Sequence, residues 1–152
     1  MPARIRTRRP RRSDNPVAAA LRRAHAAREF ASQITTTRIK LYMLQAGEDA
    51  TDMLAALSVV LGTPCEAGAR IHGHDAPWVR QLHGALRTVA AVCLQHGYRW
   101  QPEFAPAINR AIDLAVEHRP ELDNDTFTAA WIEANHMANL ILTHSLTPDT
   151  VA

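Results

Sequence analysis

The chain has 152 residues, 47% of them hydrophobic, which is enough for one domain with its own core. Two cysteines are too few for a disulfide framework, and we find no run of the about eighteen apolar residues that a membrane span needs. The net charge of +2 hides an asymmetry: residues 1–40 hold eleven basic and two acidic side chains, whereas residues 41–152 hold six basic and thirteen acidic. A basic segment on an acidic body favours an anionic partner.

Residues 1–13 form an Arg-rich segment with too few apolar side chains to offset the entropy cost of ordering, so we expect a flexible arm. Arginine neutralises phosphate without reading sequence, and we expect the arm to bind nucleic acid, DNA or RNA, with basic residues of the next segment extending the surface. Three alternatives stay open: a solvated tail, a tail that folds back on the acidic body, and a targeting segment. The expected phosphate contacts are Arg4, Arg6, Arg8, Arg9, Arg11, Arg12, Arg22, Arg23 and Arg28.

Helical signals begin directly after the arm. Asp14, Asn15 and Pro16 are typical of a helix start. The pattern then predicts a helix over 17–34, and we expect its apolar residues to face the core. Those residues follow three- and four-residue steps: Val17, Ala20, Leu21, Ala24, Ala27, Ala31 and Ile34. Thr35–Thr37 would start a second helix that ends at Gly47, and residues 48–61 would form a third.

Residues 62–74 contain three glycines and a proline, and we expect a long irregular loop there. Helices are predicted from Asp75-Ala76-Pro77 to about His96, where Gly97 ends the helix, and from Pro102 to about Arg119. A last helix would run from a cap at Asp123–Asp125 to about His144. The sequence therefore predicts an all-α bundle of five to six helices in a single domain, 14–146, followed by a C-terminal tail, 147–152.

Two short motifs resemble metal sites. His72, His74 and Asp75, with Cys65 upstream, could ligate zinc, but Asp75 has an alternative role as helix cap. We therefore expect no metal, cofactor or catalytic residue there, and keep the four as weak metal candidates. Glu133 and His136 give a single E-x-x-H pair, whereas di-iron bundles use two. Cys93 lies on an apolar stripe and is expected to be buried and unreactive.

Three functions remain after this reading. The first is a non-catalytic, cytoplasmic, nucleic-acid-associated accessory or regulatory protein that binds the phosphate backbone through its arm. The second is an adaptor or inhibitor that contacts an acidic protein or forms a homodimer through the helix at 17–34. The third is a metal-dependent enzyme that uses the loop 65–75. A helix-turn-helix reader is not favoured, because the helix at 48–61 begins with acidic residues, which repel phosphate.

Overall fold

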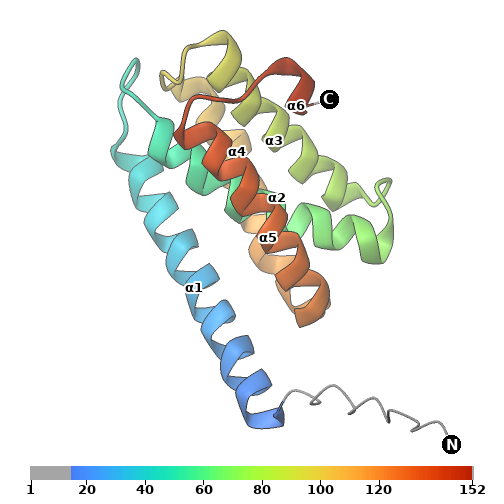
Figure 1. Ribbon diagram of the computed structural model, residues 1–152. Helices are drawn as coiled ribbons and strands as arrows, with labels where there is room; N and C mark the ends of the chain where they lie inside the picture. The colour runs from blue at the N-terminus through green and yellow to red at the C-terminus, as the bar shows by residue number, and fades with distance from the viewer. Residues whose placement is uncertain (1–14, 152) are drawn as a thin grey trace, which may run out of the picture.

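The structure is a computed structural model that describes residues 15–151, and this part of the chain is all-α, as predicted (Figure 1). It contains six α-helices, two short 3₁₀ turns and no strand. In chain order the elements are α1 (Pro16–Met43), α2 (Thr51–His72), α3 (Pro77–Gln95), η1 (Pro102–Phe104), α4 (Ala105–His118), η2 (Arg119–Glu121), α5 (Asn124–Leu142) and α6 (Pro148–Val151). The predicted disorder of residues 1–13 lies outside the described residues.

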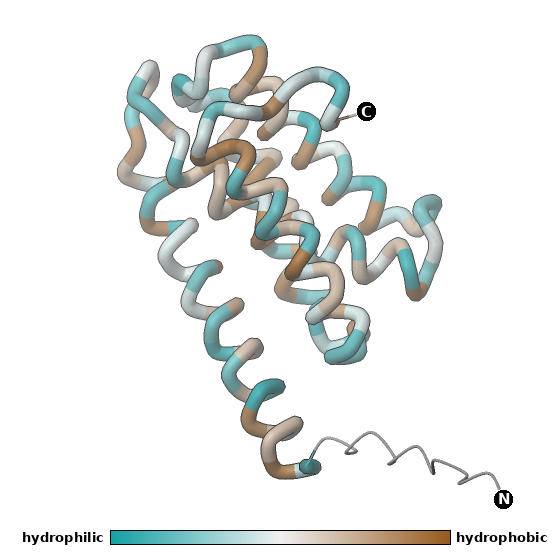
Figure 2. The backbone as a smooth tube through the Cα atoms, in the orientation of Figure 1, coloured by the Kyte–Doolittle hydropathy of each residue, from teal (hydrophilic) through white to brown (hydrophobic). Residues whose placement is uncertain are grey.

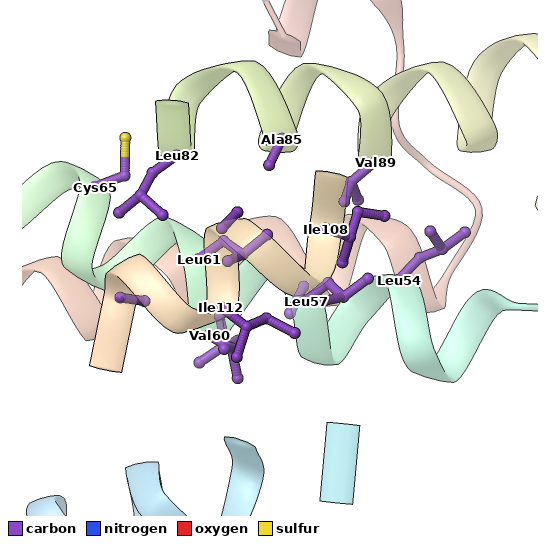
Figure 3. Close-up of a cluster of buried hydrophobic side chains, with 14 of the residues drawn as sticks. Leu54, Leu57, Val60, Leu61, Cys65, Leu82, Ala85, Val89, Ile108 and Ile112 are labelled. Atoms are coloured by element: carbon purple, nitrogen blue, oxygen red, sulfur yellow. The ribbon is translucent and has the colours of Figure 1, made fainter. Parts of the chain in front are cut away.

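Helix α2 is the centre of the body. It packs most extensively against α5 and α3, and also against α4 and α1. Figure 3 shows leucines of α2 in one cluster with apolar side chains of α3 and α4, among them Leu57, Leu82 and Ile108. Because neighbours surround α2, fourteen of its 22 residues are buried. Burial of apolar side chains on this scale is the main force that holds the bundle together.

The predicted loop at 62–74 was wrong. α2 continues to His72, and only Gly73 to Ala76 separate it from α3. Pro64 lies inside the helix and is buried. A proline there removes one backbone hydrogen bond, at a cost of about 3 kcal/mol. Burial of the surrounding residues, 57–61 before the proline and Cys65, Ala67 and Ala69 after it, offsets that cost.

The predicted break at Thr35–Thr37 was also wrong, because α1 is one helix of 28 residues. Thr35 donates its hydroxyl hydrogen bond to the carbonyl of Ala31 within the helix (3.2 Å), so the side chain does not cap a new one. Thr37 is fully buried against the body. The helix ends at Met43, and Gly47 then turns with φ +78°.

The other predicted helix ends have mixed outcomes. Asn15 caps α1 by accepting a hydrogen bond from the Val17 amide (3.0 Å), and Asp123 caps α5 by accepting one from the Thr126 amide (2.8 Å), as predicted. Asp75 is not a cap, because Ala76 takes that position and no side chain bonds to the first turn. Pro102 opens a 3₁₀ turn, and α4 itself starts at Ala105.

The connection between α1 and α2 is hydrogen-bonded to the connection between α3 and α4. The Ala50 amide donates to the Tyr98 carbonyl (2.8 Å), and the Trp100 amide donates to the Glu48 carbonyl (2.8 Å). Trp100 is almost completely buried behind this contact. The turn between α1 and α2 is therefore fixed against the connection between α3 and α4.

The C-terminal segment is more structured than the predicted tail. Leu146 is buried, and the short helix α6 packs near α3. By length and composition, α2 is the one described helix that qualifies as a membrane span, which the sequence pattern had not indicated. However, 72% of its apolar window is buried inside the protein. We interpret α2 as the core helix of a bundle.

Candidate nucleic-acid interface

The N-terminal half of α1 extends beyond the rest of the bundle (Figure 1). α1 meets the body through Phe30, Thr37 and Leu41, which are its buried residues. The Phe30 ring packs edge-on against the Phe127 ring of α5, with centroids 5.1 Å apart. Arg38 adds an ion pair to Asp113 of α4 (2.6 Å). All these contacts lie from Phe30 onward, so the preceding turns form a projection.

A wide groove of about 1040 Å³ lies between the projecting half of α1 and the first turns of α5. Leu21, Arg22 and Arg23 border it from α1, and Asp125 and Ile132 border it from α5. The two helices therefore do not pack closely over these turns. As a result Leu21, Arg22 and Arg23 remain exposed on the groove.

The predicted inward face of this helix was wrong except at Ile34, which is partly buried and packs against the core. Val17 and Leu21 are each 65% exposed, and the alanines at 20, 24, 27 and 31 are exposed as well. Figure 2 shows hydrophobic segments on the projecting turns, away from the body. The apolar spacing did identify a helix, but it could not show that the helix continues past Ile34 and packs through a different face.

Arg22, Arg23 and Arg28 lie on the projecting half of α1 and are exposed, so the structure places three predicted phosphate contacts on one element. Glu29 is the acidic residue of this half and is partly buried. The six arginines from Arg4 to Arg12 lie outside the described residues. In sequence they directly precede the basic end of α1, which extends the same positive charge.

The four weak metal candidates are not all brought together, although Cys65 and His74 line one cleft with His83. Within residues 15–151 no three His, Cys, Asp or Glu side chains are grouped as a metal ion requires. Cys65 is buried in α2, where its thiol contacts the Val79 carbonyl (3.7 Å). His72 instead approaches Glu121 (3.7 Å), which also contacts His118 (3.1 Å).

Both cysteines are buried and free. Burial raises the pKa of the Cys65 thiol to about 11 and the pKa of the Cys93 thiol to about 12. The thiolate is the nucleophilic form, so neither residue is suited to nucleophilic catalysis near neutral pH. The expectation that Cys93 is buried is confirmed, whereas the expected loop position of Cys65 was wrong.

Glu133 of the E-x-x-H pair forms an ion pair with Arg70 and is not paired with His136. Arg70 of α2 binds Glu133 (2.8 Å) and Glu66 (3.0 Å) at once, and the two carboxylates hold the pKa of the guanidinium above its ordinary value. His136 is exposed. Asn135 donates a hydrogen bond to the Trp131 carbonyl inside the same helix (2.9 Å).

Thr51 and His144 join the start of α2 to the end of α5. The Thr51 hydroxyl donates to Asp49 (2.6 Å), and His144 Nε2 lies 2.9 Å from the Thr51 hydroxyl oxygen. His144 and Tyr98 both have positive φ, and their rings stack 3.8 Å apart. Because the hydroxyl proton points to the Asp49 carboxylate, the imidazole is placed to donate to Thr51 and does not act as its base.

The sequence pattern did not indicate a cationic concavity that the structure shows on the body. A cleft of about 400 Å³ is lined by His74, Arg80, His83 and Arg87, and the last two also border an apolar cavity of about 240 Å³ between α2, α3 and α5. Neither Arg80 nor Arg87 has an ion pair within residues 15–151. A signal was present in the sequence, because positions 80, 83 and 87 share one face of a helix.

Comparison of the chain with protein-family models, curated proteins and solved structures finds no match.

Proposed function

We propose that this protein is a non-catalytic accessory or regulatory protein that binds nucleic-acid phosphates through α1 and the Arg-rich segment before it. The observation that carries the proposal is the projection of the basic half of α1 beyond an acidic body (Figure 1). A nucleic-acid backbone can approach Arg22, Arg23 and Arg28 on the projection while most acids of the body stay away from it. Contacts of this kind are independent of sequence and sensitive to salt.

The test compares two triple variants of the full chain for binding to mixed-sequence duplex and single-stranded nucleic acid. Arg22→Gln/Arg23→Gln/Arg28→Gln removes three charges from the projection. Arg70→Gln/Arg99→Gln/Arg110→Gln removes three charges from the body, outside the cleft at Arg80 and Arg87, and is the matched control because the net charge changes equally. We expect the first variant to weaken binding at least tenfold and the second to change it little. Equal effects of the two variants would contradict the proposal, since only total charge would then matter.

A second candidate function, protein–protein interaction, is favoured by the exposed apolar side chains of α1. Val17 and Leu21 contribute nothing to phosphate binding, yet they are exposed like the arginines beside them. Removal of residues 1–13 separates the two functions. A change in oligomeric mass without a change in nucleic-acid binding would favour the interaction module, whereas the opposite result would favour phosphate binding.

A further inference from the structure

The cationic cleft and the apolar cavity of the body share a boundary on α3. His83 and Arg87, one helical turn apart, line both of them. The cleft has a volume of about 400 Å³ and the cavity a volume of about 240 Å³. Since the same two side chains border both spaces, a ligand that lies across them would reach the cleft with one end and the cavity with the other.

The cleft is lined by cationic side chains that have no anionic partner. Arg80, His83 and Arg87 follow one another in steps of three and four, which places them on one face of α3. Among the described residues that line the cleft, none is acidic. Neither guanidinium has an ion pair or a hydrogen bond within residues 15–151. Guanidinium groups bind carboxylates and phosphates through charge-assisted hydrogen bonds, so the cleft suits an anion.

Gly84 lies on the cleft surface between the two arginines. Glycine in the interior of a helix is less favourable than alanine. A Cβ at Gly84 would meet nothing within 4 Å, so close packing within the described residues does not account for this glycine. The missing side chain leaves the helix surface low between Arg80 and Arg87, and an anionic group can therefore approach both of them.

The neighbouring cavity is lined mainly by apolar side chains of α3, α5 and the C-terminal segment. They include Leu86, Val89, Met137, Ile141, Leu146 and Val151. Glu66 and Glu133 also border the cavity, but Arg70 binds both of these carboxylates. An apolar cavity of about 150 Å³ is large enough for benzene, so this larger cavity has room for an alkyl chain of about six to eight carbons.

We propose that the cleft and the cavity together bind a small amphipathic anion, a carboxylate or a phosphate monoester that carries an alkyl tail. The anionic headgroup lies on Arg80 and Arg87, and the tail passes His83 into the cavity. A purely apolar ligand would leave the two guanidiniums without a partner, and a small inorganic anion would leave the cavity unfilled. A ligand with both parts matches the charge of one space and the apolar lining of the other.

Isothermal titration calorimetry on the full chain tests both parts of the ligand. Octanoate should bind at least tenfold more tightly than acetate, which lacks the tail, and than octanol, which lacks the charge. From butyrate to octanoate the affinity should rise by about fourfold for each added methylene. Octyl phosphate is compared with octanoate, and the tighter of the two identifies the preferred headgroup. Failure of both to bind, or acetate or octanol binding as tightly as octanoate, would overturn the proposal.

The headgroup position is tested by removing the two cleft charges. Arg80→Gln/Arg87→Gln should weaken octanoate binding at least tenfold. Arg99→Gln/Arg110→Gln is the matched control, because it removes two charges from the body outside the cleft and the cavity. The control should leave the affinity unchanged. Equal weakening by the two variants would mean that net charge attracts the anion, and it would overturn the assignment of the cleft.

The tail position is tested by filling the cavity. Ala134 lines it from α5, and Ala134→Leu occupies the space of the tail without a change in charge. This variant should weaken octanoate binding at least tenfold. Ala107→Leu adds the same atoms at an exposed position of α4 and should have no effect. Thermal unfolding shows whether both variants are folded, and the exposed arginine variants decide the question if Ala134→Leu is not. Unchanged octanoate binding by folded Ala134→Leu would overturn the placement of the tail.

The amphipathic-anion site does not depend on the proposed nucleic-acid function, because the cleft lies on α3 and the proposed nucleic-acid contacts lie on α1 and the segment before it. Arg80→Gln/Arg87→Gln should therefore keep its affinity for nucleic acid. Arg22→Gln/Arg23→Gln/Arg28→Gln should likewise keep its affinity for octanoate. A loss of nucleic-acid binding in the cleft variant beyond that of its control would assign the cleft to nucleic-acid phosphate and overturn the proposal.

Discussion

Gly68 of α2 lies directly against the Trp78 side chain of α3. The Trp78 ring covers this glycine, and a Cβ added there would overlap the ring, with Cζ2 only 2.8 Å away. The same ring is also held by the His118 imidazole, which stacks on it with centroids 4.5 Å apart, and by His72, which packs edge-on at 6.0 Å. Trp78 therefore has little room to move aside.

Gly68→Ala should consequently destabilise the protein by about 1–3 kcal/mol, the usual cost of overpacking a core. Gly84→Ala is the matched control: Gly84 also lies inside a helix, but a Cβ there meets nothing within 4 Å. It should be neutral or stabilise by up to about 1 kcal/mol through helix propensity. Urea denaturation measures both changes. A neutral Gly68→Ala would mean that Trp78 is not confined.

Asp123 caps the N-terminus of α5 through its carboxylate, so the contribution of this cap to stability depends on pH. Hydrogen bonds from the Thr126 amide and hydroxyl lower the pKa of its carboxyl below the ordinary 3.8. A carboxylate with a lowered folded-state pKa stabilises the protein in full above the unfolded-state pKa, and this contribution is lost as pH falls through the folded-state pKa.

Asp123→Ala should therefore lower the melting temperature at neutral pH, and the difference from wild type should shrink as pH falls below about 4. Asp125→Ala, two residues later in the first turn, is the control and should have a smaller effect. Thermal unfolding followed by circular dichroism over this pH range measures both. A difference that does not change with pH would show that the charged carboxylate is not the cap.

At the scale of elements, the sequence predicted the helix class and several helix ends but not the extent of α1 or α2. Some helix ends depend on local sequence alone and were predicted correctly. They are the caps at Asn15 and Asp123 and the stop at Gly97. Gly62 and Pro64 are equally strong local signals for a break, yet the helix continues through them. The reason is tertiary: this stretch is buried against α3 and α5, which the sequence of α2 alone does not reveal.

The two halves of α1 should differ in stability. Residues from Phe30 onward pack on the body, whereas the preceding turns contact it little. Hydrogen exchange at concentrations where the protein is monomeric should show fast exchange over 16–29 and slow exchange over 30–43. Uniform protection in the monomer would contradict the projecting geometry.

The candidate site was predictable only in part. Clustered arginines are visible in the sequence, and three of them share the projecting half of α1. The sequence could not show that this half leaves the body, because the apolar spacing of Val17 and Leu21 resembles that of a core helix. The cationic cleft at Arg80 and Arg87 was not predicted, because its two arginines are separated from other basic residues and do not form a run.

At the scale of the whole molecule, positive charge is concentrated in the first 40 residues and negative charge in the rest of the sequence. The basic residues of 1–40 lead into a projecting helix, and the acidic residues belong mostly to the body. In the proposed function, repulsion between the body acids and phosphate would confine polyanion binding to the basic end.

The most direct measurement is the salt dependence of nucleic-acid binding by the intact chain and by a chain that lacks residues 1–13. We predict that the intact chain binds at low salt and that log K falls linearly with log salt. On duplex DNA, truncation should make the slope shallower by about 0.9 for each phosphate that the removed arginines neutralise. Failure of the intact chain to bind at low salt, or equal affinity and slope for both chains, would contradict phosphate binding through the basic end.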